Sequence, residues 1–467
     1  MSIQDTLKDK KKLPLLIAGG ILLIVLLLAI FLLLMKKGKT STQAPSIDTG
    51  KKENNQQVEQ TPVSGEITYW GLWESEAVME SLIEEFETNN PGTKIHYSQQ
   101  TFAEYENTLH TRLSQAATTS EPAPDVFRIH NTWLPKYASL LSPMPTSVMT
   151  REEYAEKFYP TCLEDFTGKD GTTIYAVPFG IDGLMVFYNK QLLAEQNVKE
   201  PPTDWDSFFS LARKLTKKDS SGRIIQAGVA LGSSRNVRHS SEIILFFLLQ
   251  EGVDLIDSTR TKISLNNERS IGVFQTYVDF ATGNNAVWSS SLNNDLNMFF
   301  AGKLAMMIAP SWRVFDIIKA APSIEFGTAP LPQLEANENE VYYSTYWAEA
   351  VNKKSPNPEL AWRFVKFLAE KEQQLEMYSN ASTVGARAFG EPYSLVELNS
   401  EMQGKAYVDA IAKMAPNMES WQLGDEFFVR QTIEEAITQI AEGNKSIDAV
   451  LRDAENTINT RLAQTNK

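Results

Sequence analysis

Apolar residues along the chain alternate between two spacings, which predicts strands followed by helices. The segment 66–70 (EITYW) is typical of a short strand, and Val78, Leu82 and Phe86 then recur at the spacing of a helix that the turn sequence NNPG ends. The same alternation continues through the strand-like segments TKIHYSQQ and DVFRI, with Tyr105, Leu109 and Leu113 between them at helical spacing. Strands that alternate with helices indicate an α/β fold with a largely parallel sheet.

Two later segments carry clear helix-start signals. PPTDWDSFFSLARKLTKK places Thr203 and Asp206 at the spacing of a capping box, ahead of one apolar face. SPNPELAWRFVKFLAE has Pro358 near its beginning, where a helix tolerates proline. Both segments predict amphipathic helices that pack on a sheet.

The first 65 residues differ from the rest of the chain. Leu13–Met35 is an uninterrupted run without charge, and at about 1.5 Å per residue it is long enough to cross a bilayer. We expect residues 1–12 to be a basic cytoplasmic end, 13–35 an uncleaved transmembrane anchor and 36–65 a disordered tether. We expect a single-pass protein of the cell membrane with its globular part extracytoplasmic. Lysines flank the run on both sides, so they give only a slight preference for this orientation.

Composition excludes several classes of function. The chain holds 44 Lys and Arg against 58 Asp and Glu, a net charge of −14, and this acidic balance argues against a nucleic-acid partner. Cys162 is the only cysteine, and the four histidines form no H-E-x-x-H pattern, so we expect no metal and no cofactor. The sequence DSSG at 219–222 lacks the later acidic residues of a calcium loop and is typical of a hairpin turn.

Seven segments, in order, resemble the extracellular solute-binding proteins of ABC importers, in the family that includes the maltose-binding protein. They span roughly residues 66–370 and read ITYWGLWESEAVMESLIEEFETNNPGTKI, PDVFRIHNTWLPKYA, YAVPFGIDGLMVFYNKQLL, PPTDWDSFFSLARKLT, FFAGKLAMMIAPSW, FGTAPLPQ and SPNPELAWRFVKFLAE. The final 97 residues match less distinctly. The resemblance implies a two-lobe periplasmic-binding-protein fold whose lobes close on a ligand.

This resemblance also implies how the chain divides. One lobe would hold residues 66–178 with 328–370, and the other 179–327 with 371–467. The hinge crossovers would fall at AVPFGID, at FGTAPLP and near Leu368–Glu370. We expect the protein to be a monomer.

Candidate ligand-binding residues follow the strands. Ligands bind beyond the carboxyl ends of strands in open α/β sheets, which favours Trp73, Glu74 and Trp133, with helix–sheet packing as the alternative. Arg128 and Asn131 lie near Trp133 and have side chains that could hydrogen-bond a ligand.

The family resemblance adds five more candidates. It implies that Trp312 stacks on a sugar and that Tyr346, Trp347 and Trp421 reach the cleft between the lobes. Asp182 would face the same cleft just past the first hinge, or else cap a local turn beside Gly183. Aromatic faces beside carboxylates and amides suit a carbohydrate, although a peptide or polyol would also fit.

The leading function is therefore a membrane-tethered receptor that captures a sugar or oligosaccharide and presents it to ABC permease subunits. A sensor or adhesin without transport needs the same cleft and stays open as an alternative. A glycosidase is the least favoured, because the chain has no G-x-S-x-G elbow, phosphate loop or metal constellation. We expect no enzymatic activity and no catalytic residue.

Overall fold

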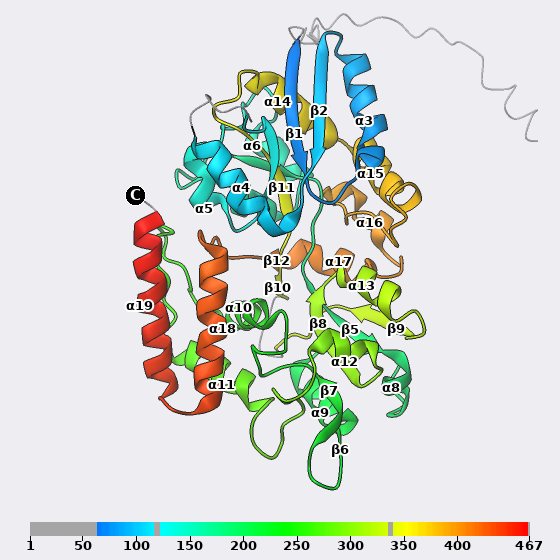
Figure 1. The fold of residues 1–467 in the computed structure, drawn as a ribbon, viewed down its shortest axis with the longest axis vertical. Coiled ribbons are helices and arrows are strands. Elements are labelled where there is room, and N and C mark those ends of the chain that lie inside the picture. The colour runs from blue at the N-terminus through cyan, green and yellow to red at the C-terminus, as the bar shows by residue number, and fades with distance from the viewer. Residues whose placement is uncertain (1–62, 116–121, 335–339, 466–467) are drawn as a thin grey trace, which may run out of the picture. The chain divides into compact units, whose positions relative to one another are not determined.

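Two five-stranded sheets organise the part of the chain that the structure, a computed structural model, describes: residues 63–115, 122–334 and 340–465 (Figure 1). Each sheet, with the helices packed on it, forms one lobe. The α/β fold class expected from the alternation of strands and helices is confirmed.

The sheet of the first lobe joins segments from distant parts of the chain. Its strand order is β2 (Thr93–Gln99), β1 (Gly65–Gly71), β3 (Val126–His130), β11 (Trp347–Val351) and β4 (Ala176–Pro178). Strands β1, β2 and β3 run parallel, whereas β11 runs antiparallel to β3 and β4. Gly65, which the sequence prediction placed at the end of the tether, is the first residue of β1.

Helices of the first lobe come mainly from the first half of the chain. They are α3 (Glu76–Asn89), α4 (Phe102–Ser114), α5 (Leu134–Tyr137), α6 (Arg151–Lys157), α7 (Pro160–Phe166), α14 (Pro358–Leu368) and α15 (Lys371–Thr383), with the short helix η1 (Ala138–Leu140). Pro358 is the first residue of α14, as the sequence indicated. Helix α15 packs against α3, so residues 371–383 lie with the first lobe, whereas the sequence prediction placed them in the second.

The second sheet has the strand order β6 (Lys217–Lys218), β7 (Ile224–Val229), β8 (Leu304–Pro310), β5 (Leu184–Asn189) and β9 (Phe326–Ala329). The segment 219–222 turns between the antiparallel strands β6 and β7, which confirms the predicted hairpin. The chain passes from the first sheet to the second between β4 and β5, where the sequence predicted a crossing.

Eight helices among the described residues lie with the second sheet: α8 (Lys190–Ala194), α9 (Trp205–Leu215), α10 (Ser240–Gln250), α11 (Glu268–Asp279), α12 (Asp295–Phe300), α13 (Arg313–Ala320), α18 (Glu426–Glu442) and α19 (Ile447–Thr465). The N-cap of helix α9 lies one residue later than predicted. Asp204 rather than Thr203 is the cap, and its side chain accepts the hydrogen bond from the backbone N–H of Ser207.

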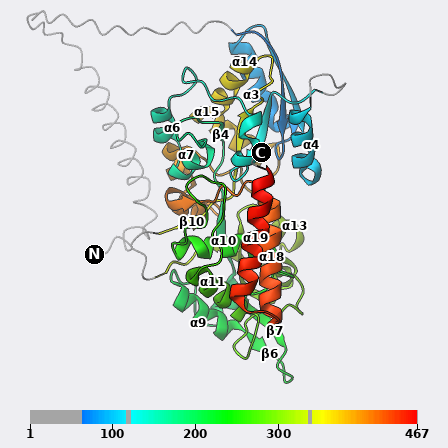
Figure 2. The same ribbon diagram turned by 90° about the vertical axis from the view of Figure 1, so that its left-hand side faces the viewer.

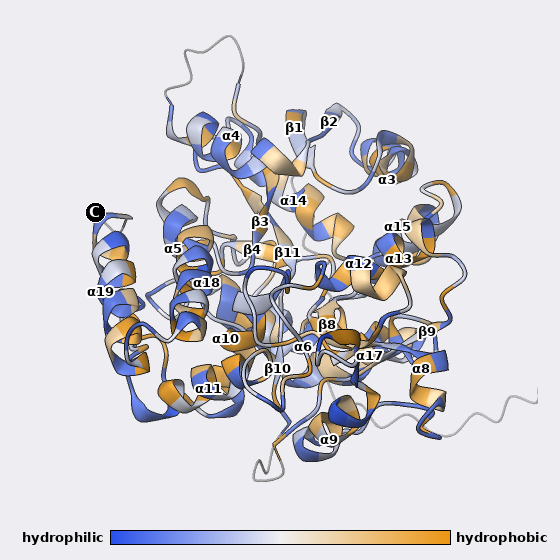
Figure 3. Cartoon of the chain, turned by 60° about the horizontal axis from the view of Figure 1, so that its bottom comes forward, coloured by the Kyte–Doolittle hydropathy of each residue, from blue (hydrophilic) through white to orange (hydrophobic). Residues whose placement is uncertain are grey.

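Helix α10 lies at the centre of the second lobe. It is apolar on all sides and almost wholly buried, as expected of a helix surrounded by others. Helices α18 and α19 run side by side, and α18 packs on α10. Figure 3 shows that hydrophilic and hydrophobic residues alternate along both helices. Figure 2 shows the same pair edge to edge, with the end of α19 directed toward the first lobe.

Short elements connect the two lobes. They are the paired strands β10 (Tyr342–Tyr343) and β12 (Met418–Glu419), with α16 (Asn399–Met402), α17 (Asp409–Met414), η2 (Val396–Leu398) and η3 (Ala415–Asn417).

Among the described residues, no helix combines the length and apolarity that crossing a membrane needs. The predicted anchor at 13–35 and most of the tether lie outside these residues.

Candidate functional site

An aromatic cluster lies at the carboxyl ends of β1 and β3 and consists of Trp73, Phe102, Trp133 and Trp347. Trp347 is its centre, with ring centroids 5.1 Å from Trp133, 5.9 Å from Phe102 and 6.1 Å from Trp73. The rings meet edge to face, an arrangement that stabilises aromatic pairs. Phe102 remains 55% exposed, so the cluster is open to solvent at that ring.

Trp133 lies on the buried side of this cluster. Only 5% of it is exposed, because Tyr137 stacks on its ring at 5.5 Å and Trp347 meets it edge to face. Its indole N–H donates to Oε2 of Glu426, the first residue of α18, at 3.1 Å. Trp133 therefore positions the cluster rather than offering a free face to a ligand.

A buried set of charged side chains, which includes Glu74, lies next to Trp73 of this cluster. Arg128 is 1% exposed and contacts three carboxylates: Glu349 at 2.6 Å, Glu391 at 2.9 Å and Glu74 at 3.1 Å. Burial raises the pKa of Glu349 to about 7, although Arg128 opposes this shift. Arg128 and Glu74 thus pair within the protein, and neither is available to a ligand in the way that the sequence suggested.

Asp182 has a local explanation. Its Oδ1 accepts from the backbone N–H of Gly183 at 2.8 Å, and its Oδ2 accepts from the Ser311 hydroxyl at 2.8 Å. Burial raises the pKa of Asp182 to about 7 in spite of these bonds. Of the two alternatives considered from the sequence, these bonds show the local one: the carboxylate caps the turn at Gly183. It also bonds Ser311, the residue that precedes Trp312.

Trp312 is the most open of the predicted tryptophans, with 43% of its surface exposed. The Arg313 guanidinium lies 3.9 Å from its ring centroid, and the His239 ring approaches its edge at 5.8 Å. Arg313 is itself held by Asp316 at 2.8 Å. A rigidly backed and exposed indole of this kind can stack on a flat apolar surface.

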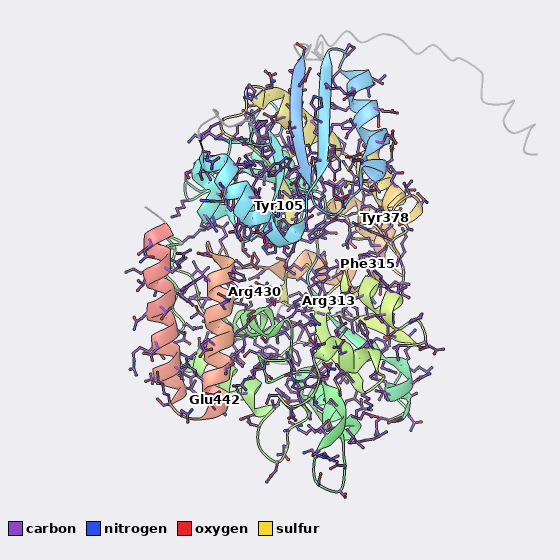
Figure 4. All side chains as sticks on the ribbon, in the orientation of Figure 1. Tyr105, Arg313, Phe315, Tyr378, Arg430 and Glu442 are labelled. Carbon is purple, nitrogen blue, oxygen red and sulfur yellow. The ribbon has the colours of Figure 1, made fainter. Side chains whose placement is uncertain are left out.

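A line of charged groups extends from the aromatic cluster to Trp312 across helices α18 and α10. His130 faces Glu426 at 3.3 Å, Glu426 faces Arg430 at 3.5 Å, and Arg430 pairs with Glu242 at 3.1 Å. Glu242 also contacts His239 at 3.1 Å. Figure 4 shows Arg430 and Arg313 on the side of the second lobe that faces Tyr105 of the first.

The protonation states in this line follow from burial and charge. Burial alone would raise the pKa of Glu242, but Arg430 and His239 lower it to about 2, so Glu242 is an anion at neutral pH. Burial lowers the pKa of His130, and the charge of Glu426 does not reverse this. His130 is therefore neutral at pH 7, with its Nε2 3.0 Å from the Thr345 hydroxyl.

Two predicted residues lie outside this arrangement. The Tyr346 hydroxyl donates to Asp165 Oδ2 at 2.7 Å in a buried cluster where burial raises the pKa of Asp165 to about 6. Trp421 is partly buried, and its indole N–H points to the Leu245 carbonyl at 3.4 Å. The Tyr346 hydroxyl is thus bonded inside the protein, and Trp421 contacts α10.

Sequence reasoning missed several groups that the fold brings to the site: Phe102, His130, His239, Glu242, Arg313, Glu426 and Arg430. Two of the spacings were readable, because Glu426 and Arg430 lie four apart, and His239 and Glu242 three apart, as paired residues on helices do. Among the described residues, no group of three His, Cys, Asp or Glu side chains could hold a metal ion.

The comparison with known families decides the identity of this fold. The model of the bacterial extracellular solute-binding proteins matches residues 81–388, about two-thirds of the chain. The chain belongs to this family. The resemblance stated from its sequence segments is therefore confirmed.

Individual relatives of this solute-binding protein are distant and differ in how much of the chain they cover. The diacetylchitobiose binding protein DasA of Streptomyces coelicolor is 24% identical over 398 residues, which are 82% of this chain and 86% of that protein. The galactooligosaccharide-binding protein of Bacillus subtilis is 24% identical over 217 residues, 46% of this chain and 49% of that protein.

Solved structures share the two-lobe fold. The sugar-binding protein MalE of Xanthomonas citri has a TM-score of 0.68 at 21% identity, covering 86% of this chain and 98% of that one. The cyclic α-maltosyl-1,6-maltose binding protein of Arthrobacter globiformis has a TM-score of 0.68 at 18% identity, covering 86% of this chain and all of that one. At these identities the likeness establishes the fold.

Proposed function

We propose that this solute-binding protein captures a sugar or oligosaccharide between its lobes and delivers it to the permease subunits of an ABC importer. One observation carries the proposal: the exposed Trp312, with Arg313 over its ring, is connected by a line of paired polar and charged side chains to an aromatic cluster that has one open ring. A sugar presents apolar C–H faces to such rings and hydroxyls to such charges.

The relatives support the same class of ligand. The proteins named for diacetylchitobiose, galactooligosaccharides and maltose derivatives differ in their sugars but share carbohydrate as the ligand. The same relatives are binding proteins, which favours capture and release over catalysis. The ligand would act by preferring the closed arrangement of the lobes, which is sufficient to drive closure.

Residues 13–35 complete this proposal as a membrane anchor, with the two lobes outside the cell membrane. An anchor of this kind would hold the receptor near its permease and raise its effective concentration there. The length and apolarity of the run support this placement.

The test is a binding screen on the full-length chain with maltotetraose, diacetylchitobiose and a galactooligosaccharide, against a polyol and an amino acid mixture. A sugar at 100 times its Kd should stabilise the fold by about 2.7 kcal/mol, a visible rise in melting temperature. Trp312→Ala should remove most of the response. Ile225→Ala is the control: it shortens an exposed apolar side chain elsewhere, on β7, and should keep the response. A response to the amino acids alone would contradict the sugar assignment.

A further inference from the structure

Residues 384–394 form a strap that contacts both lobes. The strap follows α15 of the first lobe and lies against the first crossing, where Ile181 N–H donates to the Pro392 carbonyl at 2.8 Å. Gly180 and Tyr393 pair as an isolated antiparallel bridge at the same place. The strap is therefore fixed to the segment through which the chain passes between its sheets.

One end of the strap holds the loop that carries Trp73 and Glu74. The Arg387 guanidinium donates to the Trp73 carbonyl oxygen and lies 3.4 Å from Glu74 Oε1. Arg387 is 24% exposed at its side chain, whereas Glu74 is 2% exposed. Because Glu74 also pairs with Arg128, Arg387 adds a second cation to this carboxylate and ties the loop to the strap.

The middle of the strap holds helix α13 of the second lobe. The buried Phe389 ring packs on Phe315 with centroids 4.7 Å apart. Phe315 lies in the first turn of α13, three residues after Trp312, which caps that helix. Figure 4 shows Phe315 at the edge of the second lobe, below Tyr378 of α15.

Close contacts also fix the strap on either side of Arg387 and Phe389. A Cβ atom on Gly390 would lie 2.5 Å from the Tyr378 Cα, and one on Gly180 would lie 2.7 Å from the Glu391 carboxylate. Glu391 in turn pairs with the buried Arg128 at 2.9 Å. Ala386 adopts a positive φ of 51°, a conformation that a residue with a side chain keeps only when its surroundings hold it.

We infer that Arg387 is a positioning residue that, through the strap, couples the loop of Trp73 to the helix that begins at Trp312. The two rings belong to different lobes, and Arg387 and Phe389, which are two residues apart in the strap, contact the supports of both. A change at one contact is therefore transmitted to the other through the short stretch of chain that joins them. This inference rests on the proposed function only in its last step, where coupling sets the affinity for a sugar.

The first experiment needs no ligand. The full-length chain is labelled with 5-fluorotryptophan, and the fluorine resonances of Trp73 and Trp312 are assigned with Trp73→Phe and Trp312→Phe. Arg387→Met keeps an unbranched side chain but removes the guanidinium and its donors, so it should shift both resonances. Arg387→Lys should move both back toward their wild-type positions. The control Arg235→Met removes an exposed pair with Glu442 at 2.7 Å and should shift neither.

Phe389→Leu alters the strap at its contact with α13, and it should shift the Trp312 resonance and, through the strap, that of Trp73. It also keeps the inference testable if Arg387→Met does not fold. A shift confined to the resonance nearest each substitution would overturn the coupling, and so would two unchanged resonances in a folded variant.

The second experiment measures affinity for maltotetraose. Arg387→Met should weaken binding about tenfold, within the range typical of coupled sites, and Arg387→Lys should restore most of it. Equal affinity of Arg387→Met and wild type would overturn the role of Arg387 in binding. If the wild-type protein binds none of the sugars tested, the proposed function fails while the resonance experiment still decides the coupling.

Discussion

The aromatic cluster of the first lobe and Trp312 of the second lobe present candidate tryptophans in opposite states. In the first lobe Trp73, Trp133 and Trp347 pack against one another above a buried ion cluster, and only Phe102 of that group is well exposed. In the second lobe Trp312 stands 43% exposed with a guanidinium over its ring. The comparison teaches that a tryptophan after a strand can be a structural centre or a binding surface, and that its neighbours decide which.

This difference predicts that the two sides separate stability from binding, and the largest effect should come from Trp347. Trp347→Ala should lower the free energy of unfolding by about 3 kcal/mol or more, because it removes the ring at the centre of the cluster. Trp312→Ala should cost about 1 kcal/mol or less, since much of that ring is exposed to solvent in the folded protein. Urea unfolding of both variants measures the contrast. Equal losses would show that the two tryptophans do not differ in role.

A smaller effect should come from Glu426, which joins the two sides. Its Oε2 accepts from the Trp133 indole and from the Thr132 hydroxyl at 3.2 Å, and it lies near Arg430. Glu426→Gln keeps one acceptor but removes the charge, so it should cost about 1–3 kcal/mol of unfolding free energy. Glu442→Gln, at the other end of the same helix and exposed, should cost less than about 0.5 kcal/mol. A loss for Glu442→Gln as large as that for Glu426→Gln would remove any special role of the contact between the lobes.

The contrast between the lobes also marks what the sequence could predict. The α/β alternation, the first crossing and the ends of β1 and β3 were readable, because each depends on residues close together in the chain. Whether each tryptophan ring is packed inside the protein or exposed could not be predicted from the sequence. The hydrogen bond between Trp133 and Glu426 joins residues 293 positions apart, and the pair of Arg128 with Glu349 joins residues 221 apart.

Helix α15 is a second limit of the sequence. Its residues fit either lobe by pattern, and tertiary contacts such as those of Ser81 with Glu376 and of Val78 with Asn380 place it on α3. That placement moves the last passage between the lobes to the strap, where no composition signal marks it. Arg387 and Phe389 were therefore invisible as functional candidates, although both contact the supports of predicted ones.

The smallest effect sharpens the comparison at the point where the second lobe begins. Asp182 accepts from Ser311 beside Trp312, and burial raises its pKa to about 7, above the value of an exposed aspartate. The folded protein thus binds more protons than the unfolded chain between about pH 4 and pH 7. The stability contributed by this site is therefore present at low pH and decreases as pH rises through this window.

Asp182→Asn should remove that loss, because the amide keeps an oxygen for the Gly183 N–H and offers an N–H to the Ser311 hydroxyl. The variant should melt at a higher temperature than wild type at pH 8 and close to it at pH 4.5. Thermal melts at both pH values measure the difference, with Asp316→Asn as a control on a more exposed carboxylate. A variant less stable than wild type at pH 8 would mean that Asp182 works as an anion, and the second lobe would then present a charge beside its exposed tryptophan.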